Sequence, residues 1–241
     1  MDPAGEAVPF IVPEKPLKDD FVNITGLPAG MDPANNLVIK AIRMIREIQK
    51  IPFLRIHLHK AIPVGAGLGG GSSDASTFMN ALNNHFGLEI SNGKLKQLSA
   101  KLGSDCPFFI DCVPSFARGR GEMLTRVNPL AEGFHLLLVN PGIHINTREA
   151  YSFSTPGQPD SNLKELYDLD ISKWKDVIIN DFEVSIFKKH PQIAEIKSRL
   201  YNMGAVYSSM SGSGSTVYGI FRNKPEIPGS LKQFVIYSDS L

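Results

Sequence analysis

Five glycines within seven positions constrain more than any other feature how this 241-residue chain can fold. They lie in the stretch PVGAGLGGGSSDAS, residues 63–76, which continues with small polar residues. Ordered glycine loses more conformational entropy than any other residue, so a cluster is expected where a loop needs positive φ angles or where another group touches the main chain. We expect that other group to be phosphate.

Periodic patterns flank the glycine run on both sides. The preceding FLRIHLHK alternates apolar and polar residues and predicts a half-buried strand, with His57 and His59 on its solvated face rather than in a metal site. The following SSDASTFMNALNNHF has apolar residues at helical spacing and predicts a helix that ends before Gly87. These apolar positions are Ala75, Phe78, Met79, Leu82 and Phe86. A glycine loop that leads into a helix N-terminus offers free N–H groups and the positive end of the helix dipole, so the sequence predicts a phosphate-binding loop.

One other kind of phosphate loop competes with this interpretation. Gly65, Gly67 and Gly70 match the dinucleotide pattern G-x-G-x-x-G, and Glu89 lies where a ribose-binding acid would fall. The preceding strand alternates instead of being buried on both faces, and the next element after the helix is another helix. A dinucleotide-dependent oxidoreductase is therefore the weaker alternative.

The Walker type of loop does not fit the residues at the helix start. That pattern requires a lysine before Ser or Thr, whereas Gly71, Ser72 and Ser73 stand at the corresponding positions. The two serines can cap the helix, donate to a phosphate oxygen or hold a metal ion, and the sequence leaves these roles open.

Composition and charge limit the class of partner. The chain is 42% hydrophobic and 20% charged with a net charge of +1, which is typical of a soluble protein of one or two domains. Near-neutral charge argues against nucleic acid and membrane partners and favours a small molecule. Cys106 and Cys112 are too few for a disulfide framework, so we expect reduced, buried cysteines in a cytoplasmic protein. No apolar stretch has the length of a membrane span, and MDPAGEAVPF does not resemble a signal peptide.

Periodicity predicts further elements in the first half of the chain. MDPANNLVIKAIRMIREIQK predicts a helix with Asp32 as N-cap and Pro33 in the first turn. Its buried stripe comprises Val38, Ala41, Ile42 and Ile45. A further helix is predicted from Ser91 to about Leu102, and CPFFI and SFARG are expected to be short strands.

The second half has a different character. FHLLLVNP predicts a hydrophobic strand, and Pro191 opens a helix that Gly204 closes, with Ile193, Ile196 and Leu200 turned inward. AVYSS and TVYGIF predict strands on either side of a second loop of small residues within MSGSGSTVYG. Strands and helices mix without regular βαβ alternation, so we expect an α+β chain of two domains, residues 1–131 and 132–241.

The two glycine motifs resemble those of the kinases grouped around galactokinase, homoserine kinase, mevalonate kinase and phosphomevalonate kinase, the GHMP kinases. PVGAGLGGGSSDAS is similar to their central phosphate-binding motif and MSGSGSTVYG to their C-terminal glycine motif. NNLVIKA, LGSDCPFFI, FARGRGE, NPGIHINTREAY and NDFE resemble, in the same order, segments of one branch of this family. The resemblance implies an N-terminal domain like domain 2 of ribosomal protein S5 and a ferredoxin-like C-terminal domain. For this branch it also implies transfer of phosphate from ATP, with Mg²⁺, to the 2-hydroxyl of 4-diphosphocytidyl-2-C-methyl-D-erythritol in non-mevalonate isoprenoid synthesis.

The resemblance also assigns site residues. The catalytic aspartate falls on Asp105, where partial burial beside CPFF would raise the pKa of a general base toward working pH. The residues expected to bind ATP are Pro63, Gly65, Ala66, Gly67, Leu68, Gly69, Gly70, Gly71, Ser72, Ser73 and Asn36. The residues expected to bind the substrate, a cytidine diphosphate derivative of a sugar alcohol, are Thr147, Tyr151, Gly212, Ser213 and Gly214. Asp74 is expected to be an acid of the helix's first turn or to touch the magnesium shell indirectly.

One part of the family pattern is missing. The family begins with a strand that carries Lys and, two residues later, Asn, followed by a Tyr-His pair, and residues 1–26 contain none of these. Lys15 and Lys18 are poor substitutes because they lie beside prolines or acids. The N-terminal domain is therefore expected to be incomplete and the chain as written to be a poor enzyme, with a nucleotide-binding but inactive or truncated relative as the alternative function.

Overall fold

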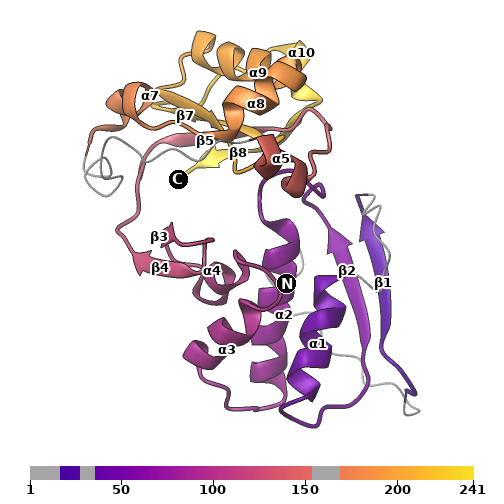
Figure 1. Cartoon of the computed structure of the whole chain (residues 1–241). Helices are drawn as coiled ribbons and strands as arrows, with labels where there is room; N and C mark the ends of the chain where they lie inside the picture. The colour runs from indigo at the N-terminus through magenta and orange to yellow at the C-terminus, as the bar shows by residue number, and fades with distance from the viewer. Residues whose placement is uncertain (1–16, 28–35, 154–168) are drawn as a thin grey trace.

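The computed structural model describes residues 17–27, 36–153 and 169–241, which form two groups of elements (Figure 1). The elements of the first half are β1 (Phe21–Gly26), α1 (Leu37–Arg46), β2 (Arg55–Lys60), α2 (Gly70–His85), α3 (Asn92–Ser99), α4 (Cys106–Asp111), β3 (Ser115–Arg118) and β4 (Met123–Arg126). The elements of the second half are β5 (His135–Val139), α5 (Thr147–Phe153), η2 (Ile171–Lys173), α7 (Trp174–Val177), α8 (Phe182–Lys189), α9 (Pro191–Asn202), β6 (Tyr207–Met210), β7 (Val217–Phe221), α10 (Gly229–Lys232) and β8 (Val235–Ser240). Helices and strands are mixed in both halves, as expected for an α+β chain.

The second half contains a four-stranded sheet in the order β6-β7-β5-β8, and every neighbouring pair is antiparallel. Helices separate β5 from β6 and β7 from β8, so the chain runs β-α-β-β-α-β through this sheet. That succession, with the first strand placed between the third and the fourth, is the ferredoxin-like arrangement. The predicted strands around FHLLLV, YSSM and VYGIF are confirmed.

Both faces of this sheet are covered. Alternate residues of β5 point to opposite faces, so Leu137 and Val139 join a core with Ile193 and Leu200 of α9. Leu136 instead packs in a second cluster around Trp174 of α7. The inward positions predicted for the helix that begins at Pro191 are therefore confirmed.

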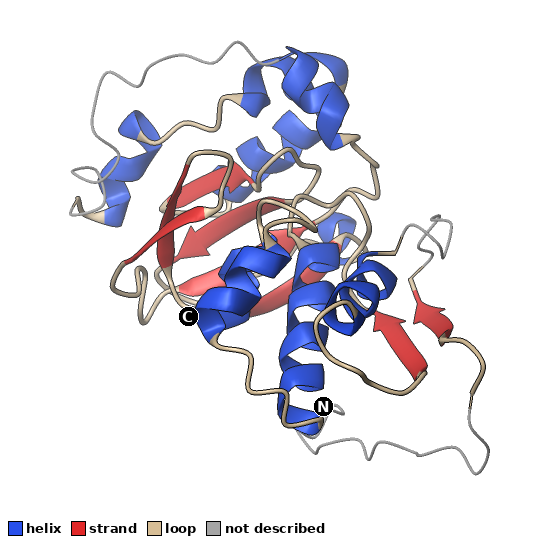
Figure 2. Cartoon of the chain, turned by 60° about the horizontal axis from the view of Figure 1, so that its bottom comes forward, coloured by secondary structure: helices blue, strands red, loops and turns tan. Residues whose placement is uncertain are grey.

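The first half is built around α1 and α2. The stripe predicted for α1, which comprises Val38, Ala41, Ile42 and Ile45, is buried. Ala41, Ile42 and Ile45 of this stripe pack in one core with α2, through its residues Ala75, Met79 and Leu82. β1 pairs in parallel with β2, and β3 pairs antiparallel with β4. Figure 2 shows the strands of the four-stranded sheet lying together, apart from the β1–β2 pair, with helices between them.

Several local predictions are wrong. CPFFI is not a strand but the start of α4, because Pro107 suits the first turn of a helix and Cys106 and Ile110, four residues apart, share its buried face. α1 has Asn36 as its N-cap, whereas Asp32 and Pro33 lie outside the described residues. Cys112 is exposed rather than buried, at the left-handed C-cap of α4.

α2 also begins earlier than predicted. Its first residue is Gly70 and its N-cap is Gly69, so the last two glycines of the run are helical. Asp74 consequently lies in the second turn of α2 and not in the first. Within the described residues, none of the helices has both the length and the apolar character that crossing a membrane requires.

Candidate functional site

The first glycine loop, residues 63–69, joins β2 to α2 and has the geometry of an anion-binding loop. Gly65, Gly67 and Gly69 have φ values of +69°, +74° and +66°, which L side chains rarely adopt. The first helical hydrogen bond runs from the Ser73 N–H to the Gly69 carbonyl, at 2.9 Å. The N–H groups of residues 70–72 precede this bond and are the orphan donors of the helix N-terminus. They lie at the positive end of the α2 dipole, where an anion is stabilised.

Protein groups occupy the space beside several of these glycines. A Cβ on Gly65 would overlap the ring of His144, and one on Gly67 would overlap the Ser211 carbonyl oxygen. A Cβ on Gly69 would lie 2.9 Å from the ring of Phe109 in α4. The close approach expected from the sequence is therefore present, but at these three positions it is made by the protein itself.

The second glycine loop, residues 211–216, lies against the first one. The Ser211 hydroxyl donates to the Gly67 carbonyl at 2.8 Å, and the Thr216 N–H donates to the Ala66 carbonyl at 3.1 Å. A Cβ on Gly212 would lie 3.3 Å from the Gly67 carbonyl oxygen. The tertiary structure thus brings together the two glycine motifs, which are about 145 residues apart in the sequence.

Asp105 lies at the N-terminus of α4, and α4 packs on the start of α2. The Ser76 hydroxyl donates to the Cys106 carbonyl at 2.8 Å. Phe109 covers Gly69. On the other side, a Cβ on Gly121, in the turn between β3 and β4, would lie 3.0 Å from Asp105 Oδ1. The predicted base is therefore held between the helix that follows the first glycine loop and the FARGRGE turn.

The surroundings of Asp105 favour its neutral form. The residue is exposed, but the protein around it removes part of its hydration and raises the pKa of the carboxyl above its ordinary value. The neighbouring Cys106 thiol is buried, which raises its pKa, and hydrogen bonds with the side chains of Ser72 and Ser76 partly offset this effect. Neither Ser72 nor Ser73 caps α2.

Asn36 is buried, and its Oδ1 accepts a hydrogen bond from the Val38 N–H at 2.9 Å, which caps α1. The next residue, Leu37, lies 3.7 Å from where a Cβ on Gly71 would be. The N-termini of α1 and α2 therefore meet beside the first glycine loop, in which Pro63 and Leu68 are partly buried.

Thr147 and Tyr151 both lie on α5 and are exposed. The Tyr151 side chain is 61% exposed, and its ring packs edge-on against Phe182 at 4.9 Å between centroids. In the second loop, Gly212 and Gly214 have positive φ angles. The structure thus places the two predicted substrate residues of α5 beside α8, and α8 contacts the second glycine loop as described below.

Lys60 is a candidate that the sequence interpretation missed. It is the last residue of β2, its side chain is only 5% exposed, and its ammonium group pairs with the Asp74 carboxylate in α2. This ion pair joins the two elements that the first glycine loop connects. Alternation in β2 places Lys60 on the same face as Ile56 and Leu58 and was the available signal, but a lysine at the end of a strand is usually exposed.

The outward face of β2 carries His57 and His59 as predicted. Both are exposed, and their rings lie 2.8 Å and 3.1 Å from the hydroxyl of Thr25 on β1. No cluster of three or more metal-binding side chains is found in the described parts of the chain. Lys15 lies outside the described residues, and Lys18 lies just before β1.

The two halves of the chain match two descriptions of one family. Residues 36–112 match "GHMP kinases N terminal domain", and residues 162–229 match "GHMP kinases C terminal". Together with the relatives below, these matches show that the chain belongs to the GHMP kinase family and has its two-domain α+β fold.

Similar proteins narrow the comparison within this family. The chain is 45% identical to a 4-diphosphocytidyl-2-C-methyl-D-erythritol kinase of Parabacteroides distasonis, over 89% of this chain and 78% of the relative. It is 44% identical to the protein of that name in Bacteroides thetaiotaomicron, over 84% of this chain and 74% of the relative. A crystal structure of 4-(cytidine 5'-diphospho)-2C-methyl-D-erythritol kinase superposes with a TM-score of 0.67 at 30% identity, over 86% of this chain and 74% of that one. These matches support neither the dinucleotide-dependent oxidoreductase nor an inactive relative.

Proposed function

We propose that this chain is an enzyme that transfers the γ-phosphate of ATP to the 2-hydroxyl of 4-diphosphocytidyl-2-C-methyl-D-erythritol, a step of isoprenoid synthesis. The observation that carries the proposal is the direct contact between the two glycine loops, Ser211 to Gly67 and Thr216 to Ala66, beside α4, whose N-cap is Asp105. The acceptor follows from the relatives, which are named for this substrate. The two free cysteines favour a reducing compartment, so we place the reaction in the cytoplasm.

ATP phosphates are assigned to the first glycine loop, residues 63–69, and to the first turn of α2. The N–H groups of residues 70–72 supply donors, and the α2 dipole adds positive potential without a P-loop lysine. Asn36 and Leu37 lie at the adenosine side because the start of α1 meets the start of α2. This arrangement holds the transferring phosphate by backbone groups that need no rearrangement during the reaction.

We assign most of the ligands of Mg²⁺ to the phosphates of ATP and few to the protein. Magnesium commonly binds one or two protein oxygens together with substrate phosphates and waters. The Ser73 hydroxyl, in the first turn of α2, is an oxygen donor that fits this limited role, whereas the Asp74 carboxylate is paired with Lys60 and would touch the magnesium shell only indirectly. When bound, the ion neutralises phosphate charge.

Asp105 is assigned as the general base. Its carboxylate accepts the proton of the acceptor hydroxyl while that oxygen bonds to the γ-phosphorus and the bond to the β–γ bridging oxygen breaks, so that ADP leaves. A raised pKa makes the carboxylate a stronger base than an ordinary aspartate. Thr147 and Tyr151 are assigned to the cytidine, with the Tyr151 ring stacking on the base, and Gly212, Ser213 and Gly214 to the phosphates and the acceptor.

A direct assay tests the proposal. The purified chain is incubated with ATP, Mg²⁺ and 4-diphosphocytidyl-2-C-methyl-D-erythritol, and ADP and the phosphorylated product are quantified. Homoserine and mevalonate serve as control acceptors because kinases for them share this fold. We expect turnover with the diphosphocytidyl acceptor alone; turnover of a control acceptor in its place would contradict the proposed substrate.

The domain division is proposed to fall near residue 131, between β4, which ends at Arg126, and β5, which begins at His135. Limited proteolysis tests this division. Cleavage between these two strands that leaves two stable fragments is the expected result, whereas preferred cleavage inside either predicted domain would contradict it.

A further inference from the structure

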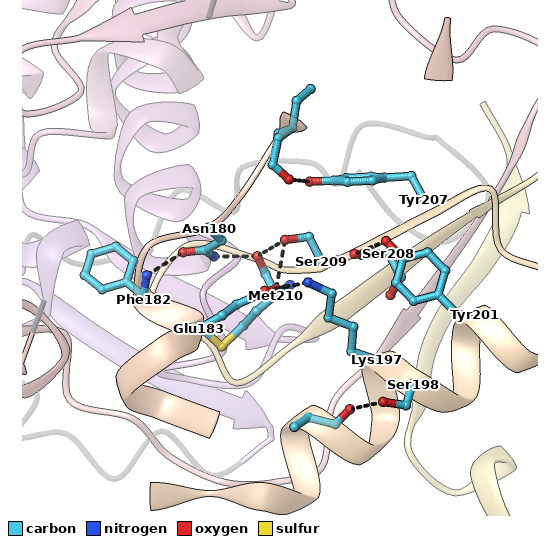
Figure 3. A network of polar contacts seen from close by, with 12 residues as sticks. Asn180, Phe182, Glu183, Lys197, Ser198, Tyr201, Tyr207, Ser208, Ser209 and Met210 are labelled. Atoms are coloured by element: carbon cyan, nitrogen blue, oxygen red, sulfur yellow. Dashed lines mark hydrogen bonds and ion pairs between the residues drawn. The ribbon is translucent and has the colours of Figure 1, made fainter. Parts of the chain in front are cut away.

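Asn180, just before α8, holds the start of the second glycine loop (Figure 3). Its Nδ2 donates to the Met210 carbonyl at 2.7 Å and to the Gly212 carbonyl at 2.8 Å. Its Oδ1 accepts from the Phe182 N–H at 3.0 Å. The amide therefore ties the first turn of α8 to both ends of the Met210–Gly212 segment.

Glu183 holds the same segment from inside the protein. The residue is only 6% exposed, and its Oε1 accepts from the Met210 N–H at 2.8 Å and from the Ser209 hydroxyl at 3.0 Å. Its Oε2 pairs with the ammonium group of Lys197 on α9. A buried carboxylate is costly unless it is paired and hydrogen-bonded, and here both conditions are met.

The anchored segment is also the one that reaches the first glycine loop. Ser211 lies between the two carbonyls that Asn180 holds, and its hydroxyl donates to the Gly67 carbonyl at 2.8 Å. Inside the loop, the Ser211 N–H donates to the Thr216 carbonyl and the Gly214 N–H donates to the Ser211 carbonyl. These bonds close the loop, and the hydrogen bonds of Asn180 and Glu183 fix where its start lies in the protein.

We propose that Asn180 and Glu183 are positioning residues of the phosphoryl-transfer site, which hold the second glycine loop in place against the first. This inference rests on the proposed function. Neither residue is assigned to contact ATP or the acceptor; both act through the backbone of Met210–Gly212. A misplacement of reacting groups by about 1 Å can cost a factor of about 100 in rate, so a loosened loop is expected to lower turnover strongly.

The variant Asn180→Asp tests the donor side of this network. It keeps the acceptor for the Phe182 N–H but places an oxygen opposite the carbonyls of Met210 and Gly212. We expect kcat to fall about 10- to 100-fold. The matched control is Ser208→Ala, on β6, the strand that ends at Met210. It removes a buried hydroxyl that donates to the Tyr218 carbonyl and not to the loop.

The control separates positioning from stability. Ser208→Ala is expected to lower the melting temperature and to keep kcat within about 2-fold of wild type, since the loop stays anchored. An Asn180→Asp variant with wild-type kcat would overturn the proposal. The proposal would also be overturned if Ser208→Ala lost as much kcat as Asn180→Asp for the same drop in melting temperature.

A pair of variants at Glu183 tests the acceptor side independently, including the case in which Asn180→Asp does not fold. Glu183→Gln keeps an oxygen for Met210 and Ser209 but loses the ion pair with Lys197, whereas Glu183→Ala loses both. We expect Gln to restore most of the kcat lost in Ala, by about 10-fold, because the hydrogen bonds to the loop matter more than the charge. Equal kcat in the two variants would overturn the proposal.

A second measurement, the affinity for a non-hydrolysable ATP analogue by calorimetry, tests the positioning role without using the acceptor. Its outcome is therefore distinct from the test of the proposed substrate. If wild type does not phosphorylate the diphosphocytidyl acceptor, the proposed substrate fails. The positioning role then stands on a loss of analogue affinity of about 10-fold in Asn180→Asp but not in Ser208→Ala, and it falls if the two variants bind equally.

Discussion

The two glycine loops of this kinase are held in place by different means. The first connects β2 to α2, and the Lys60–Asp74 ion pair joins those two elements through their side chains. The second also has an ion pair beside it, Glu183–Lys197, but there the carboxylate itself accepts a hydrogen bond from the Met210 N–H at the loop's start. The ion pair beside the first loop thus joins its flanking elements, and the first loop's backbone accepts hydrogen bonds from Ser211 and Thr216 of the second loop. Asn180 and Glu183, by contrast, bond directly to the backbone at the start of the second loop.

This difference teaches that the position of a glycine loop in the fold depends on residues that lie far from it in the sequence. The partners of the first anchor lie 14 residues apart, on the strand and the helix that flank the loop. Asn180 and Glu183 lie 32 and 27 residues before the partners that they hold at the start of the second loop, Gly212 and Met210. We therefore expect changes at the first anchor to act mainly on stability and changes at the second to act mainly on turnover.

The largest expected effect is on kcat and is at Asp105, the proposed general base. Asp105→Asn removes the general base and should lower kcat by about 10²- to 10⁴-fold, while affinity for the ATP analogue stays near that of wild type. Steady-state kinetics and calorimetry on the same preparation measure both quantities. Wild-type kcat in this variant would move the base to another residue.

The next effect concerns the anchor of the first loop. Asp74→Asn leaves the buried ammonium of Lys60 without its carboxylate and should lower the free energy of unfolding by about 3 kcal/mol, as for other broken buried pairs. Urea denaturation measures the change. The matched control is Asp111→Asn, which breaks the more exposed Lys96–Asp111 pair and should cost about 1 kcal/mol or less. Equal losses in the two variants would contradict a special role for Lys60.

A smaller effect is expected where the two loops touch. Gly67→Ala places a Cβ on the Ser211 carbonyl at a φ of +74°, and such strain costs about 1 to 3 kcal/mol. The melting temperature and the affinity for the ATP analogue should both fall. Gly93→Ala is the control, because Gly93 lies in the first turn of α3 with open space around it, and this change should stabilise the chain by about 0.4 to 1 kcal/mol. If Gly67→Ala melts like wild type, the contact between the loops is not maintained in solution.

The smallest expected effect is the dependence on pH. Desolvation raises the pKa of Asp105 above its ordinary value of 3.8, so the folded chain binds this proton more tightly than the unfolded chain. Stability from this group is complete below the unfolded pKa and is lost as pH rises through the folded pKa. Asp105→Asn should therefore gain slightly in stability over wild type across that window, as measured by melting at several pH values. If the variant is more stable than wild type only below pH 3.8, the pKa of Asp105 is lowered in the folded chain and not raised.

Local patterns were sufficient for most elements and for the location of the first loop. Alternation predicted β2, and helical spacing predicted the buried faces of α1, α2 and α9, because side-chain periodicity is a property of the segment itself. CPFFI was predicted as a strand because a short apolar run has no periodicity that separates a strand from a helix. Its packing against α2, through the bond from Ser76 to the Cys106 carbonyl, selects the helix.

The sequence by itself determined that a strand, a glycine loop and a helix follow one another, and from this an anion-binding site could be deduced. Only the tertiary structure decided which groups fill the space beside those glycines, which lysine is buried, and which side chains hold the second loop. These contacts join residues 14 to about 145 positions apart. Their formation depends on how the two halves pack, which no local pattern encodes, because a hydrogen bond or ion pair is selected by the position of both partners in space.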